Sequence, residues 1–119
     1  MLELCRVIFV EGKTDKEQLQ EILNESIEIA CTNGTLGSEK LEEWIIKYAD
    51  YDVYVLADAD EPGEKMRNLI TREFPNVHQL YTQRMYREVA ATPPEVLARV
   101  LSRAHFEVKP EYLDSDGER

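Results

Sequence analysis

Two acidic motifs and one glycine-rich loop each follow a short apolar stretch of the sequence. The acidic motifs are Glu11-Gly12 and Asp58-Ala59-Asp60, and the loop is Asn33-Gly34-Thr35-Leu36-Gly37. Asp58 and Asp60 are two residues apart, so in an extended chain both side chains project to the same side and reach one hard cation. Mg²⁺ prefers oxygen ligands and often binds through one or two carboxylates together with a substrate phosphate. The pair therefore predicts a Mg²⁺ site, with Mn²⁺ as the alternative ion.

Glu11 is the third acidic residue of this predicted site. If it ends a strand beside the one that leads into Asp58, its carboxylate can bind the same ion. It can equally act as a general acid or base. Glu11, Asp58 and Asp60 are therefore our candidate catalytic and metal-binding residues, and the role of Glu11 stays open between these two.

The loop at 33–37 is a candidate phosphate site. Its two glycines let backbone N–H groups approach a phosphate, and a helix that begins after it would point its positive end toward the same place. Basic side chains close to the acidic motifs would add charged donors to phosphate oxygens. The predicted phosphate-binding residues are Lys13, Asn33, Gly34, Thr35, Gly37, Lys65 and Arg67.

These residues must be positioned by the elements that alternate along the chain. Four short stretches rich in Val and Ile predict strands at 5–10, 27–31, 53–57 and 77–81. Between and after them, residues of helical period predict helices that begin near Thr14, Ser38, Glu61 and Pro94, the first with Thr14 and Glu17 as a capping box. The alternation is typical of an α/β domain whose mainly parallel sheet, of about four strands, lies between helices. Loops that leave the carboxyl ends of such strands share one edge, where ligands bind.

Size and composition limit the classes of protein. The chain has 119 residues, of which 43% are hydrophobic and 32% charged, as in a folded globular domain. We expect a single domain over 1–110 and a polar tail over 111–119. No apolar run reaches the length of a membrane span and the start lacks a signal peptide, so we expect a cytoplasmic protein that does not bind membranes. Cys5 and Cys31 lie in apolar stretches and are expected to be reduced and buried.

The net charge of −10 bears on the partners. Proteins that bind nucleic acid normally present a basic face to its phosphates. We therefore expect that binding of RNA or DNA is helped by a protein partner or by self-association into a homo-oligomer.

The order of the motifs resembles that of the Toprim family, which includes topoisomerases, bacterial primases, nucleases and recombination proteins. Glu11-Gly12 closes a strand, a Gly-Thr-x-Gly loop follows, and Asp-x-Asp then precedes Gly63. Within the family the chain is most similar to the ribonucleases that mature small ribosomal RNA, through Val-Glu-Gly-Lys at 10–13, Thr-Asn-Gly at 32–34 and Asp-x-x-Gly-Glu-Lys-x-Arg at 60–67. The resemblance implies a three-layer Rossmann-like Toprim fold, with Glu11 in the acid/base position and Asp58 and Asp60 in the metal positions.

Structural explanations compete with the functional ones. Asp60 can be the N-cap of the helix that follows, Asp58 a turn residue, and the glycine loop a plain connection. Two functions therefore remain. One is Mg²⁺-dependent chemistry on phosphodiester bonds, in RNA rather than DNA, and the other is a non-catalytic Toprim module that binds metal, nucleotide or a protein.

Overall fold

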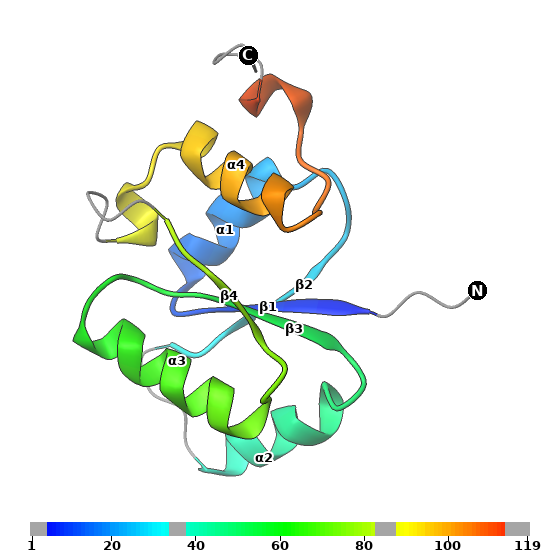
Figure 1. The fold of residues 1–119 in the computed structure, drawn as a ribbon, viewed down its shortest axis with the longest axis vertical. Coiled ribbons are helices and arrows are strands. Elements are labelled where there is room, and N and C mark those ends of the chain that lie inside the picture. Colours follow the sequence, from blue (N-terminus) through cyan, green and yellow to red (C-terminus); the bar gives the residue numbers. More distant parts are fainter. Residues whose placement is uncertain (1–4, 34–37, 83–87, 114–119) are drawn as a thin grey trace.

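The computed structural model describes residues 5–33, 38–82 and 88–113. A sheet of four parallel strands crosses the molecule, with α1 and α4 on one face and α2 and α3 on the other (Figure 1). This confirms the predicted three-layer α/β fold. The strands are β1 (Arg6–Val10), β2 (Glu28–Cys31), β3 (Asp52–Leu56) and β4 (His78–Leu80). The helices are α1 (Lys13–Ile22), α2 (Ser38–Lys47), α3 (Glu61–Glu73) and α4 (Pro94–Arg103), with the short 3-10 turns η1 (Val89–Ala91) and η2 (Pro110–Tyr112).

The order of the strands in the sheet is β2-β1-β3-β4. From β1 the chain moves to one side of the sheet, to β2, and from β3 it moves to the other side, to β4. Neighbouring connections that diverge in this way leave a crevice at the carboxyl ends of the two central strands, the usual ligand position in open α/β sheets. The fold therefore directs attention to the ends of β1 and β3.

The two central strands are buried on both faces, which explains their nearly continuous apolar sequences. Successive side chains alternate between the layers. Toward α1 and α4, the core contains Ile8, Val10, Tyr54, Leu56, Leu19, Leu97 and Leu101. Toward α2 and α3, it contains Val7, Phe9, Val55, Trp44, Tyr48, Met66 and Ile70.

Some details differ from the sequence-based expectation. Helix α1 begins at Lys13, with Gly12 as its N-cap, so the carboxylate that turns back to the cap is Asp15 and not Glu17, and glycine has no side chain to complete a capping box. Cys5 is exposed instead of buried, because it precedes β1, whereas Cys31 is partly buried, and both are free thiols. At the far end, Tyr112 and Leu113 pack against the core, so the packed part of the chain reaches at least Leu113.

Candidate metal centre

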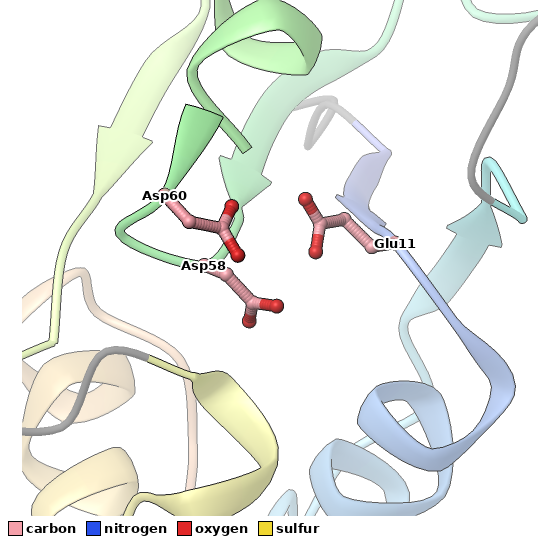
Figure 2. A group of neighbouring side chains, drawn as sticks. All are labelled: Glu11, Asp58 and Asp60. Atoms are coloured by element: carbon pink, nitrogen blue, oxygen red, sulfur yellow. The ribbon is translucent and has the colours of Figure 1, made fainter. Parts of the chain in front are cut away.

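Three carboxylates meet at the crevice between β1 and β3. Glu11 follows β1 directly, and Asp58 and Asp60 follow β3. One oxygen from each residue can be chosen so that all three atoms lie within 4.8 Å of one another. Figure 2 shows Glu11 reaching toward the two aspartates from the opposite side of the site. The predicted convergence of Glu11, Asp58 and Asp60 is therefore present in the fold.

This donor set suits a hard divalent cation. Opposite oxygen ligands are separated by about 4.8 Å around Ca²⁺ and about 4.2 Å around Mg²⁺, from metal–oxygen distances of about 2.4 and 2.1 Å. The three chosen carboxylate oxygens all lie within 4.8 Å of one another, which is compatible with binding of one such ion. All three are partly buried, so they retain access to solvent and to a substrate.

Backbone N–H groups hold the two aspartates in place. The N–H of Gly63 donates to Asp60 Oδ1 at 2.8 Å, which makes Asp60 the N-cap of α3. The N–H of Val89, from η1, donates to Asp58 Oδ1 at 2.8 Å. The structural explanation of Asp60 is thus correct and compatible with the functional one, because a carboxylate has two oxygens and Oδ2 takes no part in these two hydrogen bonds.

The surroundings raise the pKa of Glu11 from 4.5 to about 7. The largest cause is burial, which disfavours the charged form. A hydrogen bond with Asp58 and the negative charges of Asp58, Asp60 and Asp15 act in the same direction. A carboxyl group with a pKa near neutrality can both give and take protons, and a cation among the three carboxylates would favour its ionised form.

Asp15 is a fourth carboxylate at this edge, and the sequence analysis missed it. It is buried on the first turn of α1, where Oδ2 accepts a hydrogen bond from the N–H of Gly12 at 3.2 Å. The pKa of Asp15 is raised, mainly by burial. The hydrogen bond from Gly12 lowers this pKa, and the negative charges of Asp58 and Glu88 raise it further. The sequence feature that could have identified Asp15 is its spacing from Gly12. With Gly12 as N-cap, Asp15 occupies the third helical position, from which a carboxylate turns back to the cap.

The seven predicted phosphate-binding residues fall into four groups, of which Arg67 alone forms the last. Lys13 and Lys65 are exposed on α1 and α3, the two helices that begin directly after the acidic motifs. Asn33 is exposed at the end of β2 with φ of 58°, a conformation that asparagine tolerates better than most residues. Gly34, Thr35 and Gly37 lie outside the described residues.

Arg67 is placed differently from our expectation. Its side chain is buried. Nη1 of the guanidinium donates to Gln79 Oε1 at 2.7 Å, and Nη2 donates to the carbonyl oxygens of Ala57 and Leu80 at 3.1 and 2.8 Å. Burial lowers its pKa, although Tyr81, Glu64 and Glu11 act in the opposite direction. These hydrogen bonds join α3 to the ends of β3 and β4, so Arg67 supports the site and is not placed as a surface ligand for phosphate.

The chain is similar in sequence and in fold to known proteins. The family model of the Toprim domain matches residues 6–90. The Bacillus subtilis (strain 168) protein YusF, described as uncharacterized, is 47% identical over 96% of this chain and 78% of its own length. A solved small TOPRIM domain protein from Bacillus stearothermophilus is 50% identical, with a TM-score of 0.87 over 94% of this chain and 95% of its own.

More distant similarity links the chain to proteins named ribonuclease M5. The Mycoplasma genitalium protein is 32% identical over 67% of this chain, and a Ligilactobacillus salivarius (strain UCC118) protein is 36% identical over 67%. These alignments cover 44% and 43% of the ribonucleases, so the chain matches less than half the length of each. Among the described residues, no helix has the length and apolar character needed to cross a membrane.

Proposed function

Because the chain belongs to the Toprim domain family, we propose that it carries out Mg²⁺-dependent chemistry on phosphodiester bonds of nucleic acid, with RNA as the preferred substrate. The convergence of Glu11, Asp58 and Asp60 within 4.8 Å at the carboxyl edge of the sheet carries this proposal. The preference for RNA rests on the similarity to proteins named ribonuclease M5.

The three carboxylates take two parts in the proposed mechanism. Asp58 and Asp60 would hold the ion, in orientations fixed by the N–H groups of Val89 and Gly63. When bound, Mg²⁺ supplies positive charge that stabilises the charge developing on the phosphate oxygens. Glu11, which comes from the neighbouring strand, would transfer a proton to or from the reacting oxygen. Lys13 and Lys65 are exposed cations at the same edge that would contact flanking phosphates.

The rival proposal is a module that binds metal or nucleotide without cleaving nucleic acid. Two observations favour it. The net charge is −10, which opposes strong binding of a polyanion. The alignments with the Mycoplasma genitalium and Ligilactobacillus salivarius ribonucleases also cover only 44% and 43% of those proteins, so more than half of each lies outside the matched region. If the chain does act on nucleic acid, a protein partner or self-association would supply the affinity for nucleic acid that its negative charge opposes.

A cleavage assay separates the two proposals. The protein is incubated with end-labelled RNA and DNA panels in Mg²⁺, in Mn²⁺ and in a chelator. We expect cleavage that needs the ion and is lost in Asp58→Asn. Asp50→Asn is the matched control, because Asp50 is exposed on the turn before β3 and the substitution changes the net charge equally. Cleavage that survives Asp58→Asn would contradict the assignment of the site.

Metal binding can be observed without any substrate. The amide groups of Gly63 and Val89 donate to Asp60 and Asp58, so their nuclear magnetic resonance signals should move when an ion binds these carboxylates. Shifts at both amides without cleavage of any panel member would favour the non-catalytic module. Absence of shifts at both amides would indicate that the carboxylates are structural.

A further inference from the structure

Tyr81 is an aromatic side chain exposed at the edge of the sheet that carries the three carboxylates. Among the described residues, it and Ile46 are the two large hydrophobic side chains with the greatest exposure, 60% and 78%. Tyr81 follows β4 directly, at the carboxyl end of the strand. A single exposed hydrophobic side chain is ordinary on a protein surface, so a role for Tyr81 must be argued from its contacts and from its position beside the acidic site.

The ring of Tyr81 packs on the side chain of Arg67. The Arg67 guanidinium lies 4.2 Å from the ring centroid, in a cation–π contact. Arg67 is itself held by hydrogen bonds to Gln79, to Ala57 and to Leu80. One face of the ring is therefore covered by an immobilised cation, while much of the side chain stays open to solvent. The ring is thus pre-organised in an exposed position.

The register of the sheet places Tyr81 in line with the acidic site. Leu80 pairs with Leu56 and Val55 pairs with Phe9, and these are the last pairs before the strands end. Continued past the strand ends, this register brings Tyr81, Ala57 and Glu11 to the same level. At the usual strand spacing of about 4.8 Å, the backbones of Tyr81 and Glu11 are then on the order of 10 Å apart. This distance is comparable with the reach of one nucleotide from its phosphate to the outer edge of its base.

Both side chains also belong to the same face of the sheet. The alternation that puts Phe9 and Ala57 toward α3 also puts Glu11 and Tyr81 on that side. Contact of Tyr81 with Arg67, a residue of α3, agrees with this placement. A strand of nucleic acid whose phosphate lies at the three carboxylates can therefore pass over the ring.

We propose that Tyr81 is a stacking platform for an unpaired base, and that the substrate is single-stranded at the position next to the reacting phosphate. The inference rests on the proposed function and narrows its substrate class. Aromatic rings stack on any base and contribute affinity without hydrogen-bond readout. The faces of bases are open to such contact when the nucleotide is unpaired and splayed out. Stacking also needs no net positive charge, which suits an acidic chain.

Binding of short single-stranded RNA tests the proposal. The probe carries a fluorescent label and phosphorothioate linkages that resist cleavage, and its dissociation constant is measured by anisotropy in Mg²⁺. Tyr81→Ala should weaken binding about tenfold. Tyr81→Phe, which keeps the ring, should bind within about twofold of the wild type. Ile46→Ala is the matched control, because it removes the other exposed hydrophobic side chain, near the end of α2, and should leave binding unchanged.

A second readout detects the stack itself. Fluorescence of a 2-aminopurine base in the strand should be quenched by the wild type and by Tyr81→Phe, and less so by Tyr81→Ala. Tyr81→Leu keeps an apolar cover over Arg67 and so guards against loss of folding. It should behave as Tyr81→Ala does. A duplex of the same sequence should show no difference between the wild type and these variants.

The failures of the two proposals are distinguishable. Cleavage that depends on Asp58, together with equal binding by the wild type and Tyr81→Ala, would overturn the stacking role and leave the proposed function standing. Binding that depends on the ring, without cleavage of any substrate, would support stacking and count against the nuclease. The stacking proposal would be overturned if Tyr81→Phe lost as much affinity for single-stranded RNA as Tyr81→Ala. It would also be overturned if the wild type did not bind single strands.

Discussion

Gly63 packs directly against the backbone of Asp58. A Cβ atom at position 63 would overlap the carbonyl oxygen of Asp58 and lie 2.9 Å from its carbonyl carbon. The first turn of α3 therefore packs on the loop that carries Asp58 and Asp60, with no space for a side chain at position 63. The same residue donates its N–H to Asp60 at 2.8 Å, so Gly63 sets the positions of both aspartates.

Replacement of Gly63 by alanine should damage the fold and the site together. Gly63→Ala forces either α3 or the Asp58 loop to move, and such overpacking costs about 1–3 kcal/mol or more. The free energy of unfolding, measured in denaturant, should fall by that amount. Gly12→Ala is the control, because a Cβ there meets Asp15 Oδ2 at an ordinary 3.9 Å, and we expect a cost of at most about 1 kcal/mol. Equal effects of the two substitutions would contradict the close contact.

Removal of the Glu11 charge should stabilise the metal-free protein. The pKa of Glu11 is about 7 in the folded chain against 4.5 for the free group, so between these values the folded state binds more protons than the unfolded one. The contribution of Glu11 to the free energy of unfolding is therefore at its maximum below about pH 4.5. It decreases as the pH rises to about 7 and stays constant at higher pH. Glu11→Gln should abolish this decrease and raise the free energy of unfolding by about 1 kcal/mol at pH 8 in a chelator, well below the full linkage value, because the partly exposed carboxylate is screened by solvent.

The control for Glu11→Gln is Glu42→Gln, which removes a charge from the exposed face of α2. Thermal unfolding at several pH values compares both variants with the wild type. A gain in Glu42→Gln as large as that in Glu11→Gln would show that net charge, rather than the site, is responsible.

Divalent ions should raise the thermal stability of the wild type. An ion that binds only the folded state adds about 2.7 kcal/mol at a hundred times its dissociation constant. We expect Mg²⁺ and Mn²⁺ to raise the unfolding temperature of the wild type and of Asp50→Asn. The rise should be small or absent in Asp58→Asn, which has lost a charged ligand. A full rise in Asp58→Asn would place the ion elsewhere.

Substitution of Arg67 should act mainly on stability. Lysine at this position keeps the charge but cannot reproduce the fork that reaches Gln79, Ala57 and Leu80. Arg67→Lys should lower the free energy of unfolding by about 2–4 kcal/mol, because buried acceptors lose their donors. Arg72→Lys is the matched control on the same helix. Arg72 is exposed and pairs with Glu73, so we expect a change within about 0.5 kcal/mol. Full stability of Arg67→Lys would contradict the structural role.

The sequence predicted what depends on local pattern. Apolar stretches such as 53–57 are too short for helices and rich in β-branched residues, so the strands and their parallel arrangement could be inferred. Strand ends in a parallel sheet share an edge, which is why the sequence alone places Glu11 and Asp58 together.

What depends on distant contacts could not be inferred. The hydrogen bond from Val89 to Asp58 joins residues 31 positions apart, and no local pattern at either residue indicates it. Arg67 looked like a surface cation because arginines usually are, and its burial follows from the way α3 lies on β3 and β4. Asp15 was missed because the N-cap of α1 is Gly12 and not Thr14, and this shift of two residues changes which carboxylate faces the cap.

The hydrogen bond from Val89 sets a lower limit on the length of an independent domain. All four strands and the three carboxylates are complete by Leu80, yet Asp58 receives its donor from a turn that comes after the sheet is finished. A fragment cut behind β4 would contain every acidic residue of the site and still leave Asp58 without that donor. Grafts of this site onto another scaffold should therefore retain the chain through η1, and the Toprim match, which ends at residue 90, includes Val89.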